Sequence, residues 1–363
     1  MSALFRRIFV ILLVFGFALA STAAAKKHKR SHASPSATPH KRSDADIESA
    51  TRLQVFLDRE NFSPGKIDGH YNDFTFKALA LYRQSRGQPV PPSPPHPDTA
   101  PDLNGIDVGS VNPVFIDYTV TDADVKNVGP IPDAVAQKAK LPALPYRDVA
   151  EEIAEKFHCD QKFLGELNPG RTGPLKAGDQ LRVPNVEPFE LDAVKNLKPG
   201  SEITPETAND IADEPNRPNG NTEQQQPAAT VAIKVDVKTN MLGVFEGDKI
   251  VAAYPVTIGS RQTATPIGEW KVRGVAKLPT FRHDEQMLKH GERSKNFKML
   301  RPGPNNPVGV IWIALNKRGI GIHGTDDPNT IGQAVSHGCI RLANWDIIRL
   351  AGRVKGGVPV SVH

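Results

Sequence analysis

Near its C-terminus the chain reads Ile322-His323-Gly324-Thr325 and then Ser336-His337-Gly338-Cys339-Ile340-Arg341-Leu342. Cys339 follows a Ser-His-Gly turn, and His323 ends an apolar run that predicts a strand. A free thiol has a pKa of about 8.5, so thiolate chemistry at neutral pH calls for a nearby imidazole or local dipoles. The stretch therefore predicts a cysteine nucleophile with two candidate histidine bases, His323 and His337.

The turn before the cysteine suits a substrate that comes close to the backbone. Gly338 has no side chain to obstruct it. The amides of Gly338 and Cys339 are candidate donors to a developing oxyanion. The carbonyl of Gly324 and the side chain of Ser336 are both candidates to orient the ring of His323 and fix its tautomer.

This pattern resembles the signature of the L,D-transpeptidases with a YkuD-type catalytic domain. Two upstream segments resemble the same family, Thr265-Pro266-Ile267-Gly268-Glu269-Trp270 and Pro302-Gly303-Pro304-Asn305-Asn306-Pro307-Val308-Gly309, so the likeness covers roughly residues 230–362. The resemblance implies an enzyme that transfers peptidoglycan peptide stems through a cysteine thioester to an amine acceptor. That acceptor would be another stem, giving a 3-3 cross-link, or an amine-bearing wall protein.

The resemblance also implies roles for individual residues. Cys339 would be the nucleophile and His323 the proton acceptor and donor, supported by Gly324, Ser336 and Gly338. His337 would shape the pocket, bind substrate or assist the acceptor amine, or serve only the turn.

Arg341 is the candidate substrate-binding residue. Its guanidinium suits a carboxylate of the stem, because the two groups form paired hydrogen bonds. Packing onto Asp346 or the helix after it is the alternative.

Other functions stay open on the sequence alone. His323, His337 and Cys339, with His283 or His290, are zinc-ligand types, although the spacing of His337 and Cys339 is poor for chelation. The resemblance implies neither a metal nor a cofactor. The alternatives are a catalytically inactive peptidoglycan-binding protein, an L,D-carboxypeptidase and a metal-dependent peptidase.

Residues 230–363 carry a strand pattern. Apolar and polar residues alternate over 231–237, and further strands are expected around 244–252, 310–315 and 320–323, with a hairpin between 254–258 and 270–275. A short helix is expected after Asn344. This part predicts a mainly antiparallel β sandwich or barrel, the catalytic domain of a multidomain chain.

Two small modules are expected upstream. Residues 46–87 hold two helical runs around a turn-rich connection and resemble the small helical peptidoglycan-binding domain; an ordinary helical hairpin is the alternative. Residues 146–186 resemble a LysM-like α+β module, which packs two helices on a two-stranded sheet and binds glycan strands. Cys159, within it, is predicted to be a small buried apolar residue and not a disulfide partner of Cys339.

Linkers separate these parts. Residues 88–113 form a proline-rich linker, 114–145 a connecting segment with one strand-like run, and 187–229 a polar linker with one short helix around 191–197.

The N-terminus predicts export. Arg6 and Arg7 precede an apolar run over 8–20 and a small-residue site, so residues 1–25 are expected to be a cleaved secretory signal, with a retained anchor as the alternative. A basic disordered tail, 26–45, follows. The expected location is the periplasm or cell wall, with no transmembrane segment after cleavage.

The net charge of +5 does not indicate nucleic-acid binding. Residues 1–42 hold eight of the 45 basic residues and no acidic one, which leaves 37 basic against 40 acidic residues in the remainder. The resemblance implies the peptide stems and glycan strands of peptidoglycan as partners.

Overall fold

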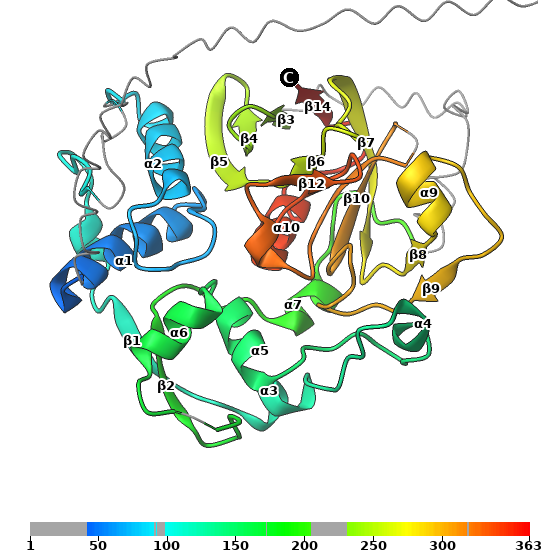
Figure 1. The fold of residues 1–363 in the computed structure, drawn as a ribbon. Helices are drawn as coiled ribbons and strands as arrows, with labels where there is room; N and C mark the ends of the chain where they lie inside the picture. Colours follow the sequence, from blue (N-terminus) through cyan, green and yellow to red (C-terminus); the bar gives the residue numbers. More distant parts are fainter. Residues whose placement is uncertain (1–41, 91, 93–98, 172, 205–230, 318) are drawn as a thin grey trace, which may run out of the picture. The chain divides into compact units, whose positions relative to one another are not determined.

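A curled sheet of eight strands forms the C-terminal part of the protein in this computed structural model (Figure 1). Its order is β13-β11-β10-β7-β14-β3-β4-β5, and only the β14–β3 and β11–β13 pairs are parallel. The strands are β3 (Val231–Asp236), β4 (Met241–Glu246), β5 (Lys249–Pro255), β7 (Gly268–Lys277), β10 (Ile311–Leu315), β11 (Gly321–His323), β13 (Ile340–Arg341) and β14 (Pro359–Val362). The mainly antiparallel character is thus confirmed, in one curled sheet.

The structure describes residues 42–90, 92, 99–171, 173–204, 231–317 and 319–363. The expected signal sequence, most of the basic tail and most of the second linker lie outside this part. Within the described residues no helix is long and apolar enough to cross a membrane.

The expected hairpin between 254–258 and 270–275 is wrong. β6 (Ile258–Gly259) pairs with β12 (Ala334–Ser336), and β7 lies between β10 and β14. A loop intervenes, in which the Thr265 hydroxyl accepts the Gly259 amide at 2.8 Å. Alternation predicts a strand correctly but says nothing about which distant strand it joins.

The predicted helix after Asn344 is confirmed as α10 (Asn344–Ala351), and it contacts β10. Trp345, Ile347 and Leu350 on this helix are fully buried with Val235 and Ile313 of the sheet. Burial of each large apolar side chain stabilises the fold by roughly 1.5–3 kcal/mol.

The first helical region covers the edge of the sheet. It consists of α1 (Asp44–Arg59) and α2 (Asp73–Ser85), which contacts β5. Between them Asn61 accepts the amide of Ala253 at 2.9 Å and Ser63 donates its own amide to Ala253 at 2.8 Å. These bonds satisfy backbone groups that an edge strand otherwise leaves open.

The second region begins and ends with the two strands of a small sheet, and helices lie between them in sequence. β1 (Phe115–Thr119) pairs with β2 (Gln180–Pro184), and α5 (Val149–Lys156) and α6 (Gln161–Leu167) lie between them in sequence. The expected connecting segment 114–145 therefore supplies one strand of this sheet. It also holds the short helices α3 (Asp122–Lys126) and α4 (Val135–Lys138), and the helix expected around 191–197 is α7 (Leu191–Asn196).

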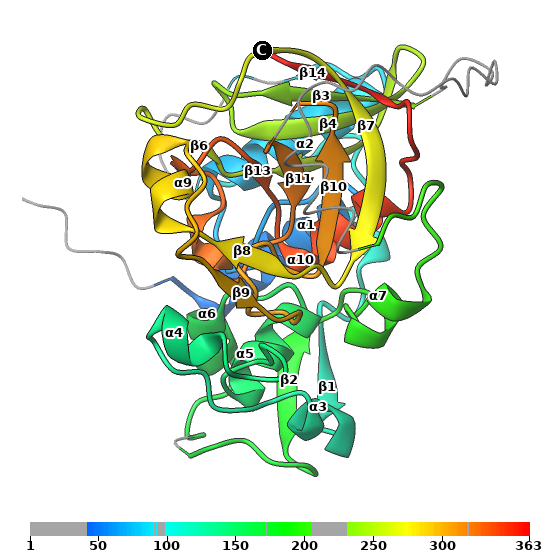
Figure 2. The ribbon, with the colours of Figure 1, turned by 90° about the vertical axis from the view of Figure 1, so that its right-hand side faces the viewer.

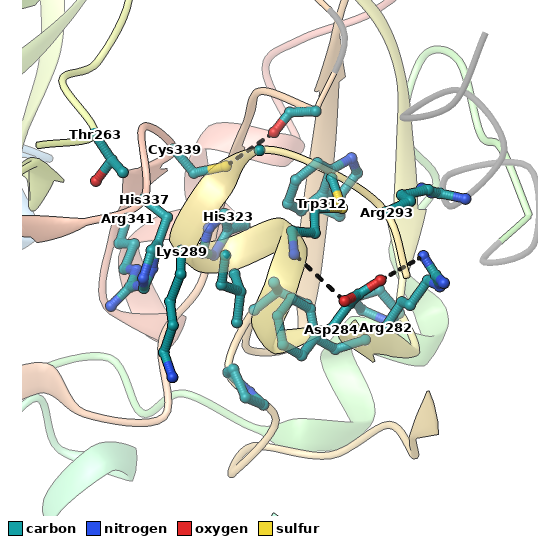
Figure 3. A pocket seen from close by; sticks show the side chains of 18 of the residues that line it. Thr263, Arg282, Asp284, Lys289, Arg293, Trp312, His323, His337, Cys339 and Arg341 are labelled. Atoms are coloured by element: carbon teal, nitrogen blue, oxygen red, sulfur yellow. Dashed lines mark hydrogen bonds and ion pairs between the residues drawn. The ribbon is translucent and has the colours of Figure 1, made fainter. Parts of the chain in front are cut away.

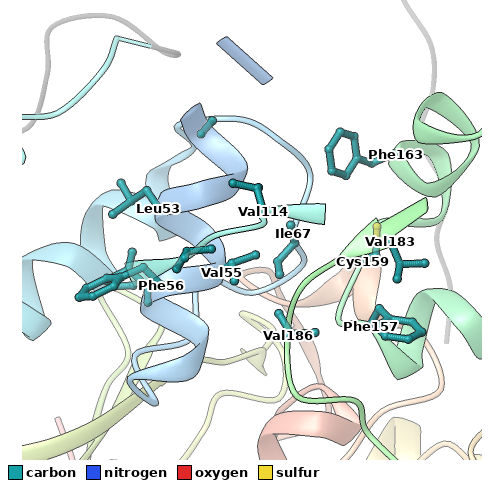
Figure 4. Close-up of a cluster of buried hydrophobic side chains, with 14 of the residues drawn as sticks. Leu53, Val55, Phe56, Ile67, Val114, Phe157, Cys159, Phe163, Val183 and Val186 are labelled. Atoms are coloured by element: carbon teal, nitrogen blue, oxygen red, sulfur yellow. The ribbon is translucent and has the colours of Figure 1, made fainter. Parts of the chain in front are cut away.

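One hydrophobic cluster joins both upstream regions. Side chains of α1, including Leu53 and Phe56, belong to the same cluster as Phe157 and Val183 of the second region (Figure 4). Cys159 is buried in it, as predicted, and is a free thiol. Residues 42–363 accordingly form one compact unit.

Candidate active site

A cavity of about 440 Å³ lies between the sheet and a segment that covers it. The covering segment is β8 (Phe281–His283), α9 (Glu285–His290) and β9 (Lys298–Leu300), near β13 and β11 (Figure 2). Four predicted site residues line the cavity together: His323, His337, Cys339 and Arg341 (Figure 3).

Strand pairing brings the cysteine and the first histidine to one place. β11 and β13 run parallel, with Ile322 opposite Ile340 and His323 opposite Arg341. The amide of Leu342 donates to the carbonyl of His323 at 2.8 Å and continues this register. Cys339 therefore reaches the cavity one residue before its strand begins.

The ring of His323 is fixed in one tautomer. Its Nδ1 lies 2.6 Å from the carbonyl oxygen of Gly324, which can only accept, so Nδ1 carries the proton. Trp312, the cross-strand neighbour on β10, stacks on the ring with centroids 5.2 Å apart and an interplanar angle of 15°. Nε2 is left unprotonated and available as a base.

The imidazole is neutral at physiological pH. His323 is 3% exposed, and burial lowers its pKa to about 3, with the charge of Arg341 acting in the same direction. The Gly324 carbonyl opposes this shift and does not reverse it.

The thiol of Cys339 is neutral as well. Burial raises its pKa, although the backbone of Gly321 and the charge of Arg341 act in the opposite direction. Its Sγ is 3.5 Å from the carbonyl oxygen of Gly319, toward which the S–H points. The resting pair is thus thiol and imidazole, which suits proton transfer during attack.

Ser336 shapes the turn and does not orient His323, so that alternative is wrong while the one naming Gly324 is confirmed. The Ser336 hydroxyl donates to the carbonyl of Cys339 at 2.6 Å and accepts the amide of Gly338 at 3.2 Å. Gly338 has a φ of 105°, which favours glycine. Because the Gly338 amide is engaged, the Cys339 amide, which has no bonded partner in the described part of the chain, is the better candidate oxyanion donor.

Arg341 lines the cavity, and no ion pair joins it to a carboxylate of the described residues, although its charge opposes the burial that raises the pKa of Asp326. Its Nε is buried and has no hydrogen-bond partner. The expected alternative, packing onto Asp346, is wrong: Asp346 accepts the Ser63 hydroxyl at 2.9 Å and lies 3.9 Å from Arg349. The Arg341 guanidinium, whose Nε lacks a hydrogen-bond partner, suits an anionic group of a ligand.

His337 is exposed and lines the same cavity. Partial burial and the charge of Arg341 lower its pKa. Of the two extra histidines weighed for zinc, His290 lines this cavity and His283 lines a neighbouring one. No group of three or more His, Cys, Asp or Glu side chains in the described ranges is arranged to hold a metal ion.

Sequence reasoning missed the cavity wall opposite the cysteine. Phe281, Met287 and Lys289 come from β8 and α9, a stretch with no recognised pattern. Trp312 was assigned only to a strand, although its alternation with the buried Ile311 and Ile313 places it on the other face. That alternation was the available signal.

Comparison with known proteins identifies the family. The family model described as the L,D-transpeptidase catalytic domain (YkuD) matches residues 230–362. The YkuD protein of Bacillus subtilis, named as an L,D-transpeptidase, is 32% identical over 217 residues, which cover 60% of this chain and 94% of that protein. This chain belongs to the L,D-transpeptidase family. L,D-transpeptidases are enzymes, and the resemblance predicted from the sequence is confirmed.

Other similar proteins carry the same family name. The YkuD protein of Bacillus licheniformis is 28% identical over 216 residues, covering 59% of this L,D-transpeptidase and 93% of its own length. Both alignments are longer than residues 230–362, so they extend into the region before the catalytic domain.

Solved structures of the family are more distant. An L,D-transpeptidase from Mycobacterium smegmatis has 22% identity and a TM-score of 0.31, covering 37% of this chain and 59% of that one. The catalytic domain of the Enterococcus faecium L,D-transpeptidase has 23% identity and a TM-score of 0.29, covering 38% of this chain and all of that domain.

Proposed function

We propose that this L,D-transpeptidase forms a thioester between Cys339 and a peptidoglycan tetrapeptide stem, and then transfers the stem to an amine. The observation that carries the proposal is a thiol and an imidazole with a free Nε2 in one cavity. Family membership makes transpeptidation the reaction to expect.

Acylation begins with attack by the thiol on the carbonyl of the third stem residue. His323 Nε2 takes the thiol proton as the S–C bond forms, so the neutral pair becomes charged only during the reaction. The amide of Cys339 donates to the oxyanion of the tetrahedral intermediate. The C–N bond then breaks, His323 returns the proton to the departing amine, and D-alanine leaves.

Transfer repeats these steps in reverse with a new amine. His323 takes a proton from the acceptor amine, which attacks the thioester carbonyl, and the sulfur departs and regains a proton. A neighbouring stem as acceptor gives a 3-3 cross-link, and an amine of a wall protein gives an attached protein. Water in the same position gives trimming of the stem.

Arg341 binds a carboxylate of the stem. Its guanidinium lines the cavity beside the reacting groups, and a carboxylate would meet the Nε that lacks a hydrogen-bond partner. His337, exposed at the same wall, contacts the substrate or the acceptor.

The upstream regions hold the enzyme on its polymer. We assign residues 46–87 to a peptidoglycan-binding-like domain and 146–186 to a LysM-like module. The two helices α5 and α6 followed by β2, which pairs with β1 from before residue 146, support the second assignment. Binding there raises the local concentration of stems, and the protein acts after export, in the periplasm or cell wall.

The test is intact-protein mass spectrometry with a tetrapeptide-stem donor. We expect a thioester adduct on the wild type, none on Cys339→Ala, and the same adduct on Cys159→Ala, since Cys159 is the buried thiol outside the cavity. Turnover by a folded Cys339→Ala variant would rule out this nucleophile.

A further inference from the structure

Asn344, at the start of α10, is buried behind the active site, at the junction between the catalytic domain and the upstream region. Its Oδ1 accepts the amide of Val310 at 3.1 Å, and its Nδ2 donates to the carbonyl of Thr325 at 3.1 Å. The same Nδ2 donates to Glu155 Oε1 at 3.0 Å. The side chain thus ties two catalytic-domain segments to α5 of the upstream region.

The carboxyl group of Glu155 is buried at a position where an apolar side chain would be usual. It is 7% exposed, and the hydroxyl of Tyr146 donates to the same Oε1 at 2.9 Å. A buried carboxyl is costly unless its oxygens have hydrogen-bond partners, and here one partner comes from each side of the junction.

The junction reaches the catalytic base through one further contact. A Cβ on Gly324 would lie 2.2 Å from Asn344 Oδ1, so the backbone of Gly324 packs directly against the Asn344 amide. The carbonyl of Gly324 is the group that holds Nδ1 of His323. A continuous series of contacts therefore leads from Glu155 through Asn344 and Gly324 to His323.

We propose that Glu155 is a positioning residue for the transpeptidase reaction, acting on His323 through Asn344 and the Gly324 backbone. The inference rests on the proposed function, in which His323 moves the proton. In this proposal the upstream region helps to position the catalytic base and also tethers the enzyme to its polymer.

The test compares two substitutions in the full chain. Glu155→Gln keeps an acceptor oxygen for Asn344 and Tyr146 and should stay within about threefold of wild-type kcat. Glu155→Ala removes the acceptor and should lower kcat by roughly ten- to a hundredfold with KM unchanged, because the base is displaced while the substrate contacts remain.

Glu152→Ala is the matched control. Glu152 lies on the same helix, is 2% exposed and accepts the Asn127 side chain at 2.9 Å within the upstream region. It should affect folding as Glu155→Ala does, yet leave kcat unchanged. An equal loss of kcat in Glu152→Ala would reduce the effect to general destabilisation and overturn the proposal.

A second readout does not depend on turnover. With ¹⁵N-labelled histidine, NMR should show a protected Nδ1–H for His323 in the wild type and Glu155→Gln, and faster exchange in Glu155→Ala. If Glu155→Ala fails to fold, Tyr146→Phe removes a donor to the same oxygen and should show the same exchange in weaker form. Unchanged Nδ1–H protection and kcat in a folded variant would refute the positioning role, whereas a wild type that forms no adduct would refute the proposed function.

Discussion

Asp58 joins three parts of the chain, and its removal should destabilise the whole unit. Its carboxylate receives two hydrogen bonds of 3.0 Å from the guanidinium of Arg349 on α10. His158, which follows α5, lies 3.0 Å from the same carboxylate through Nδ1 and stacks on Trp345 with ring centroids 5.3 Å apart. Asp58 itself is fully buried.

The loss of unfolding free energy expected for Asp58→Ala follows from the Arg349 guanidinium that the substitution leaves without its partner. Removal of one partner of a buried ion pair costs about 3–5 kcal/mol of unfolding free energy. The side chain of Arg349 keeps 18% exposure, so water partly solvates the stranded guanidinium, and the lower end, about 3 kcal/mol, is expected. Against a usual total of about 5–15 kcal/mol this is a large fraction.

Denaturant unfolding followed by tryptophan fluorescence measures this loss. All three tryptophans lie in the catalytic domain, and Trp345 is at the junction. Asp192→Ala is the control, because its ion pair with Lys195 is exposed to water and should contribute little to stability. A change below about 1 kcal/mol for Asp58→Ala, or an equal change in the control, would refute the reasoning.

Three further predictions concern the site and its surroundings. Alkylation of Cys339 by iodoacetamide should rise with pH around a midpoint above that of an ordinary thiol, because burial raises its pKa; a midpoint below pH 7 would contradict a neutral pair. Arg341→Gln should raise KM for a stem with free carboxylates by roughly tenfold and move the alkylation midpoint of Cys339 to higher pH, because the charge of Arg341 lowers the pKa of that thiol; equal KM for both proteins would remove its binding role. Burial raises the pKa of Glu155 to about 8, so as pH rises the unfolded chain releases this proton before the folded chain does. The contribution of Glu155 to the free energy of unfolding therefore declines between about pH 4.5 and 8. Glu155→Gln should lessen that decline in denaturant titrations at a series of pH values, and an identical pH dependence of stability in both proteins would contradict the prediction.

Local patterns in the sequence predicted the elements that depend on nearby residues. Alternation around Ile233 and Val235 located β3, and the apolar face around Ile347 located α10. The motif around His323 and Cys339 predicted the cavity residues, because His323 ends β11 and Cys339 precedes β13, and these two strands pair in parallel.

The missed features depend on contacts between distant residues. Phe115 and Pro184 pair across the second region, which no local pattern could reveal, so β1 was assigned to a connection. The role of Ser336 depends on how the turn closes, because its hydroxyl donates to the carbonyl of Cys339 and is not available to His323. The Glu155–Asn344 bond links residues 189 positions apart.

The backbone bonds between Asn61, Ser63 and Ala253 bear on how the enzyme should be prepared. A fragment starting at residue 231 would lose the helical region, and β5 would present unpaired amides and carbonyls together with the apolar Ile250, which packs with that region. Such an edge can recruit the same strand from a second molecule. Self-association of a shortened enzyme would then reflect the missing cover and not the behaviour of the intact chain.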